Sequence, residues 1–492
     1  MNRLNQDALE HLPPDIDRPA FDRGKYGVGV VHLGIGAFHR AHQAVFWDRV
    51  LAGEGGDWRI CGVSLRRPDV AGQLNPQDGL YTVLARDEAG DRYQVVGAVE
   101  QVLVAPDDPA RVLDLMAAPT THIVSLTVTE KGYCHDPATG RLRVNHPDIE
   151  HDLAHPSQPK SAPGFIVEAL ARRRAAGLRP FTVLCCDNLP TNGKVAGAIV
   201  TALAKARDPA LGRWVAENVT FPSTMIDRIV PATTDRERAL VAEALGFEDR
   251  GVVVTEPFIQ WVVEDRFCDG RPDLAAAGVE LVEDVLPYET MKIRLLNGSH
   301  STLAYLGYLA GYAYIRDTMR DPAFVTMIRR LMDQCVTPTL SVPAAFDLER
   351  YKDTLIERFA NPTLEHRTHQ IAMDGSQKLP QRFLETLDAC LHMGAGIEPL
   401  ALAIAGWMRY VTGIDEEGRP IEVQDPMAER FNEIAAEAGN DPARLVHGYL
   451  GIVEIFPLTI AHSETVIDTV TRALESLYEV GAQRTVRAFV SG

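Results

Sequence analysis

The feature that most constrains the fold lies near the N-terminus, where an apolar run leads into two closely spaced glycines. In YGVGVVHLGIGAFHRAHQAVFWDRVL, residues 28–33 predict a buried strand, Gly34 and Gly36 a tight turn, and the residues from about Phe38 onward a helix. A pyrophosphate site requires this order, because glycines let the backbone approach the phosphates and the helix N-terminus supplies N–H groups and positive dipole. His39 stands where the third glycine of the dinucleotide-binding pattern would be. The turn alone is therefore a weak indication.

A second predicted strand adds to this indication. Residues 59–64 form an apolar run that is followed by Arg66, Arg67 and Asp69. An acidic residue beyond the second strand binds the ribose hydroxyls of NAD, whereas arginines there favour the 2′-phosphate of NADP. The sequence offers both. We expect NAD, because Asp69 would repel the phosphate.

Further apolar runs continue the pattern of strands. They cover residues 123–129, 181–186 and 219–231, and a helical stretch at 161–177 separates the first two. This alternation predicts an α/β fold with a doubly wound, Rossmann-type sheet. Polar clusters follow the strands: Thr127 with Glu130, Asp187 with Asn188, and Asp227 with Arg228. Ligands bind at such strand ends, although Asp and Asn are also ordinary turn residues.

The texture of the sequence changes near Pro287. Strand-like runs largely disappear, and helical patterns such as AFVTMIRRLMDQCV and PLALAIAGWMRYVTG follow one another. A chain of 492 residues is too long for one ordinary core. We therefore expect a dinucleotide-binding domain over 1–285 and a mainly helical substrate and catalytic domain over 286–492, with the site between them.

Bulk properties restrict the partners. The formal charge is −18 with no compensating basic block, which disfavours nucleic acid and anionic membranes. There is no leading basic-plus-apolar segment and no apolar run of about 18 residues. These features predict a cytoplasmic protein with a small-molecule substrate. The oligomeric state stays open, with a monomer among the options.

The cysteines and histidines do not predict a metal site. Seven cysteines are scattered along the chain without a C-x-x-C pair, which is typical of a reduced protein. Two histidine pairs have helical ligand spacing, namely His39 with His42 and His366 with His369. Neither has a third ligand nearby in the sequence, so we expect no metal.

A polar group on an otherwise apolar helix is the strongest candidate for chemistry. The segment PYETMKIRLLNGSHSTLAYLG, residues 287–307, predicts a helix. At about 100° per residue, four polar side chains share one flank: Glu289, Lys292, Asn297 and His300. A glycine within a helix costs roughly 1 kcal/mol, so Gly298 indicates the close approach of a ligand or another backbone. The simple alternative is a solvated Glu–Lys pair.

Three functions compete for this group. A short-chain dehydrogenase would use Y-x-x-x-K, which Tyr288 and Lys292 match, but the match lies too late in the chain and the glycine spacing differs. A non-catalytic dinucleotide or sugar sensor leaves the polar group unexplained. A metal-independent alcohol dehydrogenase explains it. Lys292 would be the general acid–base, its pKa lowered by burial, while Asn297 and His300 hold the substrate oxygen and Glu289 relays the proton.

Several motifs together resemble the polyol-specific long-chain dehydrogenases, the mannitol dehydrogenase family. They are GIGAFHRAHQ, SLTVTEKGYC, CDNLPTNG, MIDRIVP, EPFIQWVVED and K-x-x-x-x-N-x-x-H, and they run through nearly the whole chain. The resemblance implies a Rossmann N-terminal domain, a mainly helical C-terminal domain, NAD and no metal. It maps the catalytic lysine onto Lys292, its oxyanion partners onto Asn297 and His300, and the relay onto Glu289. Motifs and strand ends together give the expected cofactor-binding residues: Gly34, Gly36, Phe38, His39, Arg40, Asp69, Thr127, Glu130, Asn188 and Asp227.

The branch of the family is less clear from the motifs. Mannitol-oxidising members carry an arginine eight residues before the family lysine that Lys378 matches, and this chain has Gln370 there. HRTHQIAMDGSQKLPQR and Arg294 look like the fructuronate-reductase branch, whereas CGVSLRRPD looks more like the mannitol branch. We expect interconversion of D-fructuronate and D-mannonate, with D-mannitol and D-fructose as the alternative. The expected substrate residues are Asn188, Arg294, Arg367, Gln370, Lys378 and Arg382.

Overall fold

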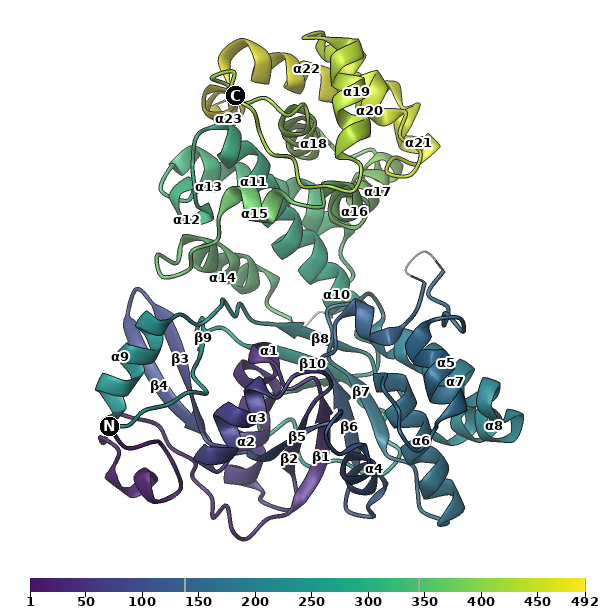
Figure 1. Ribbon diagram of the computed structural model, residues 1–492. Helices are drawn as coiled ribbons and strands as arrows, with labels where there is room; N and C mark the ends of the chain where they lie inside the picture. Colours follow the sequence, from purple (N-terminus) through teal and green to yellow (C-terminus); the bar gives the residue numbers. More distant parts are fainter. Residues whose placement is uncertain (137–138, 344–345, 492) are drawn as a thin grey trace. The chain divides into compact units, whose positions relative to one another are not determined.

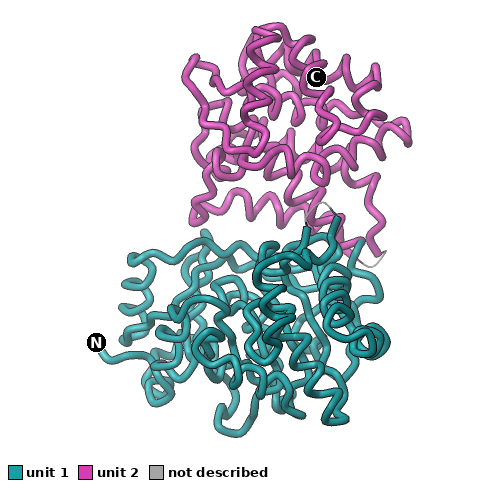
Figure 2. Tube along the Cα trace, turned by 45° about the vertical axis from the view of Figure 1, so that its right-hand side comes forward, with its two compact units in different colours: residues 1–286 teal, residues 287–492 magenta. Residues whose placement is uncertain are grey.

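The chain divides into two compact units, Met1–Leu286 and Pro287–Gly492 (Figure 2). The computed structural model describes residues 1–136, 139–343 and 346–491. The division falls one residue after the boundary expected from the sequence.

The first unit is built on a five-stranded sheet in which all neighbouring strands are parallel. The strand order is β5 (Val99–Val104), β2 (Arg59–Ser64), β1 (Val28–Leu33), β6 (Ile123–Leu126) and β7 (Thr182–Cys185) (Figure 1). The chain starts at the central strand β1, moves outward through β2 to β5, and returns to the other side of β1 with β6. Such a reversal opens a crevice at the carboxyl ends of β1 and β6, where ligands bind in α/β sheets. The Rossmann-type fold is confirmed.

Both faces of this sheet are buried, which explains its nearly continuous apolar strands. On β1, Val31 and Leu33 belong to one core and Val30 to another. The first core is shared with helices α4 (Pro109–Ala117), α5 (Pro147–Ala154), α6 (Ala162–Ala175), α7 (Asn192–Arg207) and α8 (Pro209–Asn218). The second core contains α2 (Gln43–Gly53) together with residues of two smaller sheets.

The two smaller sheets have three strands each. One has the order β11 (Glu280–Val282), β10 (Gln260–Glu264), β8 (Thr224–Asp227), and the other β4 (Gly90–Val96), β3 (Tyr81–Asp87), β9 (Val253–Thr255). Strand β8 pairs antiparallel with β10. The expectation that this run continues the doubly wound sheet is therefore wrong. An isolated apolar run does not encode which neighbour it pairs with, so the sequence could not separate the two sheets.

Strand β6 is shorter than expected. It ends at Leu126, whereas the apolar run extends to Thr129. Thr129 has φ +65° and ψ +165°, which no strand accommodates. The residues between them form a loop at the carboxyl end of the sheet, and a short 3₁₀ helix (Glu130–Tyr133) follows.

The second unit is mainly helical, as expected. Its longer helices are α11 (Gly298–Leu309), α13 (Pro322–Arg330), α14 (Leu348–Ala360), α17 (Glu385–Met393), α18 (Glu398–Val411), α19 (Ala428–Ala438), α20 (Pro442–Leu450), α22 (Glu464–Val480) and α23 (Ala482–Ser491). Helix α18 is buried from Pro399 to Val411 and packs against α11 and α22. Among its described residues, three short segments are π-helical: Lys292–Asn297, Leu331–Val336 and Pro380–Leu384.

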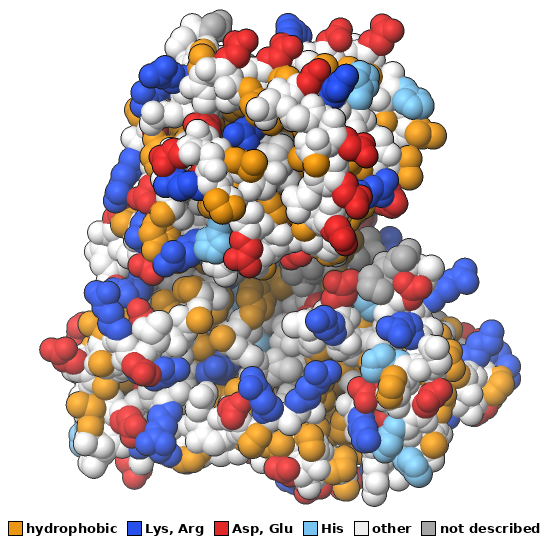
Figure 3. Space-filling model, turned by 45° about the horizontal axis from the view of Figure 1, so that its top comes forward, with side chains coloured by type: hydrophobic (Ala, Val, Ile, Leu, Met, Phe, Trp, Pro, Cys, Tyr) orange, Lys and Arg blue, Asp and Glu red, His pale blue; other side chains and the backbone are white. Residues whose placement is uncertain are grey.

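The surface carries charges of both signs. Figure 3 shows acidic and basic side chains interspersed over the visible face. Within the part of the chain that the structure describes, none of the helices combines the length and apolar character that a bilayer span requires.

Candidate active site

The glycine turn after β1 is locked against the loop after β6. Gly34 has φ +93°, and a Cβ at this position would lie 2.2 Å from the carbonyl oxygen of Thr127. The Thr127 hydroxyl donates to the Gly34 carbonyl at 2.8 Å, and the Gly36 N–H donates to the same carbonyl at 2.7 Å. Helix α1 (Ala37–Ala41) begins directly after Gly36. The turn thus aims the α1 N-terminus at the carboxyl edge of the sheet.

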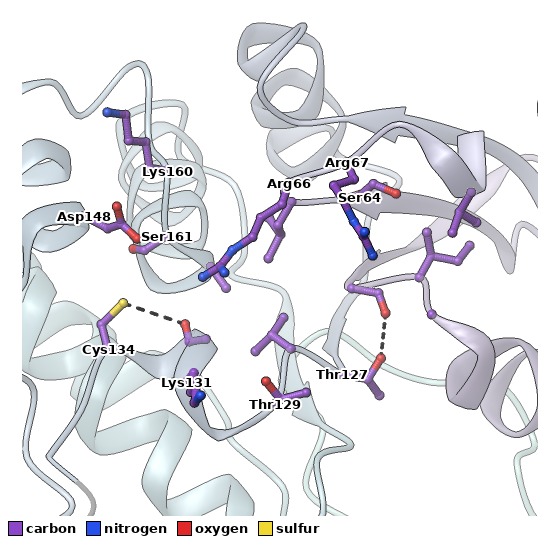
Figure 4. Close-up of a pocket in the computed structure, with 18 of the residues that line it drawn as sticks. Ser64, Arg66, Arg67, Thr127, Thr129, Lys131, Cys134, Asp148, Lys160 and Ser161 are labelled. Atoms are coloured by element: carbon purple, nitrogen blue, oxygen red, sulfur yellow. Dashed lines mark hydrogen bonds between the residues drawn. The ribbon is translucent and has the colours of Figure 1, made fainter. Parts of the chain in front are cut away.

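A cavity of about 380 Å³ lies at this edge. It is lined from the ends of β1, β2 and β6 and from the start of α6. Its charged lining residues are Arg66, Arg67, Lys131, Lys160, Asp69 and Asp148. Figure 4 shows Arg66 reaching across the cavity toward Asp148 and Ser161. Four basic and two acidic side chains make it electropositive, which suits the diphosphate of a dinucleotide.

The end of β2 presents both signs of charge to the cavity. Asp69 begins helix α3 (Asp69–Leu74), and its carboxylate lies 3.4 Å from the Arg67 guanidinium. Both side chains are more than half exposed, so the pair is weak and can open. The acid that the sequence predicts to accept ribose hydroxyls therefore lies beside an arginine in the cavity lining.

Three of the expected cofactor-binding residues in the GIGAFHRAHQ motif, Phe38, His39 and Arg40, do not line the cavity. The fully buried ring of His39 stacks on His32 of β1, with 3.4 Å between ring centroids. This stack replaces the close helix–strand packing that a third glycine gives. The Arg40 guanidinium donates to the carbonyls of Gly251 and Gly36. The ring of Phe38 stacks on His42.

The remaining expected cofactor residues lie at different strand ends. Thr127 lines the cavity with Gly34, Gly36 and Asp69. Exposed Glu130 begins the 3₁₀ helix after the β6 loop and is not among the lining residues. Asn188 follows β7 and is exposed, whereas Asp227 ends β8 and is buried. Sequence reasoning missed two lining residues, Lys131 and Lys160. Lys131 lies within the SLTVTEKGYC motif and could have been found there, whereas Lys160 lies outside the motifs.

The segment of residues 287–307 is not the single α-helix that its periodicity predicts. Helix α10 (Leu286–Met291) leads into the π-helical turn Lys292–Asn297, and α11 continues from Gly298. In an α-helix residues five apart are separated by about 140°. Bonding from i to i+5 instead places them one above the other. The π turn therefore brings Lys292 and Asn297 closer to a common face than the helical wheel indicated, and such turns are frequent at functional sites.

Another backbone explains Gly298. A Cβ there would lie 3.0 Å from the carbonyl oxygen of Arg382, which belongs to the π-helical segment Pro380–Leu384. The Arg382 guanidinium donates to the Ser301 hydroxyl at 2.7 Å and to the Asn297 carbonyl at 3.4 Å. Two π-helical turns are thus packed together at the polar group.

His300 lies in a cationic surrounding. Its ring centroid is 5.5 Å from that of Phe359 and 5.3 Å from that of His366. Burial, and then the charges of His366, Arg382, Arg358 and Lys378, hold the pKa of His300 well below its usual value. The imidazole is therefore neutral at pH 7. Its Nε2 is buried and has no hydrogen-bond partner among the described residues, so it can bind a ligand oxygen.

The other two members of the group are buried near the start of the segment. Glu289 and Lys292 are 9% and 8% exposed. Charged side chains are rarely this buried unless they are paired or functional.

Three cations surround His300, and sequence reasoning missed one of them. Lys378 donates to the carbonyls of Ile371 and Met373, and burial followed by the charge of Arg382 lowers its pKa to about 8. Arg358 is 6% exposed on α14. In the sequence, Arg358 continues the helical spacing of the apolar residues Tyr351 and Leu355. An arginine on the core face of a helix is unusual, and this signal could have identified it as a candidate.

The other expected substrate residues lie elsewhere. The Arg294 guanidinium donates to the Thr339 hydroxyl at 2.9 Å and to Glu385 at 3.4 Å. Arg367 is exposed and stacks on the Tyr314 ring. Gln370 is exposed on α15 (Thr368–Ala372).

Neither histidine pair belongs to a cluster of metal ligands. Among the described residues, Cys134, His146 and Asp148 are the group of three ligand types whose donor atoms lie within 4.8 Å of one another. Cys134 and Asp148 line the cavity beside β6.

Comparisons with known proteins place both units in one family. The mannitol dehydrogenase Rossmann domain matches residues 28–276, and the mannitol dehydrogenase C-terminal domain matches residues 284–478. The D-mannonate oxidoreductase of Escherichia coli is 48% identical over 96% of this chain and 98% of the relative. A mannitol dehydrogenase of Saccharomyces cerevisiae is 42% identical over 97% and 95% of the two chains.

A solved structure agrees with these matches. The mannitol 2-dehydrogenase of Pseudomonas fluorescens, in a ternary complex with NAD and D-mannitol, is 40% identical, with a TM-score of 0.83 and 99% of each chain covered. The strand order, the glycine turn and the electropositive cavity fit a dinucleotide independently of this likeness. The chain therefore belongs to the mannitol dehydrogenase family, and it is an NAD-dependent oxidoreductase of the class that acts on polyols and sugar acids.

Proposed function

We propose that this protein interconverts D-fructuronate and D-mannonate, with Lys292 as the general acid–base. In the reducing direction NADH supplies the hydride to the ketone carbon. Lys292 delivers a proton to the developing alkoxide oxygen, so that the ketone gains one hydride and one proton. Asn297 and His300 hold that oxygen, and Glu289 returns a proton to Lys292. In the oxidising direction the neutral Lys292 amine takes the hydroxyl proton.

The observation that carries this proposal is the cationic surrounding of His300. Arg358, Lys378 and Arg382 all act on the pKa of this histidine. A protein of formal charge −18 repels an anionic sugar acid at long range, so a local cationic site is needed to bind one. Arginine is suited to this role, because its planar fork can donate two parallel hydrogen bonds to a carboxylate.

The orphan nitrogen of His300 supports its role at the substrate oxygen. A neutral imidazole with a buried, unpaired Nε2 is costly unless a ligand completes its hydrogen bonding. Asn297 ends the π turn whose first residue is Lys292, which favours a common oxygen between them.

The second candidate is a mannitol 2-dehydrogenase, which converts D-mannitol to D-fructose. The likeness to the Pseudomonas fluorescens enzyme and to the yeast relative favours it. Its substrate ends in a neutral hydroxymethyl group and needs no cation. A non-catalytic sensor would bind the cofactor without turnover.

The deciding measurement is kcat/KM for fructuronate and for fructose, with NADH, on the same preparation. We expect fructuronate to be preferred. Fructose equal or better would make this protein a mannitol 2-dehydrogenase, and absence of turnover with both sugars would favour the sensor.

Substitutions then test the cations. Lys378→Met and Arg382→Leu should each reduce the preference for fructuronate by about 10- to 100-fold, the equivalent of losing a charge-assisted hydrogen bond of roughly 1.5–3 kcal/mol. Arg294→Leu is the matched control, because Arg294 is not among the cations that lower the pKa of His300 and its guanidinium contacts Thr339 and Glu385 instead. A preference that survives both changes would show that these cations do not bind the carboxylate.

A further inference from the structure

The loop after β6 contains a residue in a conformation that its side chain disfavours. Thr129 has φ +65° and ψ +165°, a region that is occupied almost only by glycine. A β-branched residue there is a genuine outlier. Thr127, Val128 and Thr129 all line the cofactor cavity, so the unusual backbone lies at the site itself.

One buried carboxylate holds this loop. Oδ1 of Asp187 accepts the Thr129 N–H at 2.8 Å, and Oδ2 accepts the Val128 N–H at 3.1 Å. The Tyr133 hydroxyl donates to Oδ2 at 2.6 Å from the far end of the 3₁₀ helix. Asp187 is 7% exposed and comes from the end of β7, the neighbouring strand. A single side chain thus spans the loop and the helix that follows it.

The backbone of Asp187 is also held by hydrogen bonds. Its backbone carbonyl accepts from the Asn192 amide at 2.8 Å, and the same amide donates to the Thr224 carbonyl at 2.9 Å. These hydrogen bonds tie the backbone of Asp187 to that of Thr224. At the other end of the loop, the Thr127 hydroxyl is bonded to Gly34 of the glycine turn. The loop and the turn therefore keep one shape together.

We propose that Asp187 is a positioning residue for NAD: its carboxylate keeps Thr129 in the left-handed region and so keeps the loop of residues 127–129 in the shape that the cofactor requires. The inference rests on NAD binding to this cavity and not on the identity of the sugar. Without the hydrogen bonds from the Val128 and Thr129 N–H groups to Asp187, Thr129 returns to an ordinary conformation. The loop backbone then changes its orientation within the cavity.

The test is NADH affinity, measured by fluorescence titration of the full-length protein. Asp187→Asn keeps the size of the side chain but replaces one acceptor by an NH₂ group that faces a backbone N–H. We expect the Kd for NADH to rise by about 10- to 100-fold. In the double variant Asp187→Asn/Thr129→Gly most of the affinity should return, because glycine adopts a positive φ without penalty.

Two controls separate positioning from general destabilisation. Asp249 is also a buried carboxylate that accepts two backbone N–H groups, from Thr82 and Gly251, and it does not line the cavity. Asp249→Asn should lower the melting temperature and leave the Kd unchanged. Val128→Gly adds the same backbone freedom at a position with ordinary φ, so it should not rescue Asp187→Asn.

Unchanged affinity in folded Asp187→Asn would overturn the proposal, and so would rescue by Val128→Gly equal to that by Thr129→Gly. If Asp187→Asn does not fold, Tyr133→Phe replaces it. That change removes the third donor to Asp187, and we expect a loss of affinity of a few-fold that Thr129→Gly reverses. Failure of Thr129→Gly to reverse it would again reject the inference. Because NADH binding needs no sugar, these outcomes are independent of the preferred substrate.

Discussion

The two glycines of the turn should fail in different ways when each is replaced by alanine. At Gly34 the new Cβ would lie 2.2 Å from the Thr127 carbonyl oxygen, roughly 1 Å inside the ordinary C···O contact of about 3.3 Å. The two backbones cannot separate easily, because the Gly34 N–H donates to Val63 and the Thr127 N–H donates to Leu33. Gly36 has φ −84°, and its Cβ would meet only the Gly34 carbonyl oxygen, at an ordinary 3.8 Å.

The magnitudes follow from these contacts. Overpacking costs about 1–3 kcal/mol, and the positive φ adds roughly 1–2 kcal/mol for alanine. Gly34→Ala should therefore destabilise the first unit by about 2–5 kcal/mol, which lowers its melting temperature by about 5–15 °C. Gly36→Ala should leave the melting temperature of the free protein within about 1 °C of the wild-type value. It should weaken NADH binding by at least ~10-fold, because the new methyl group would occupy the path of the pyrophosphate.

Thermal unfolding followed by circular dichroism and a fluorescence titration with NADH measure the two effects on each variant. An unchanged melting temperature in Gly34→Ala would refute the argument from the close backbone approach. Wild-type NADH affinity in Gly36→Ala would mean that the pyrophosphate does not cross the turn.

Three further predictions concern the chemistry. Lys292→Ala should fold normally and slow turnover by at least ~10²-fold, and near-normal turnover would contradict its role as general acid–base. Added chelator should leave the wild type fully active, and loss of activity would contradict a metal-independent mechanism. Because the pKa of Lys378 is lowered to about 8, its positive charge is present below that pH and lost above it, so the KM for fructuronate should rise above pH 8 while that for fructose does not. Lys378→Arg should abolish this rise, and an unchanged pH profile in Lys378→Arg would show that another group titrates. Asp69→Ala removes the repulsion of a 2′-phosphate and releases Arg67, so the ratio of kcat/KM for NADH over NADPH should fall by roughly 10-fold; an unchanged ratio would mean that Asp69 does not face the ribose.

The sequence by itself determined the local elements of the cofactor unit. The apolar run over Val28–Leu33, the two glycines and the helix that follows form one continuous segment, and the residue types within it favour a buried strand, a turn and a helix in that order. The run over Arg59–Ser64 has the same bounds in the structure. Lys292 was also predictable as a candidate for chemistry. Helical periodicity alone places this lysine on the apolar side of its helix, and it is buried in the structure.

The tertiary structure decided everything that depends on a distant partner. The need for Gly298 arises because the backbone of Arg382, 84 residues further along the chain, packs against this position. Arg358 comes to His300 from a separate helix, and Asp187 reaches across from β7 to a loop of β6. Strand β8 likewise pairs with β10 and does not join the five-stranded parallel sheet. The periodicity of a sequence predicts only which side of an element is buried. Which distant segment packs against that side depends on tertiary contacts, and periodicity carries no information about them.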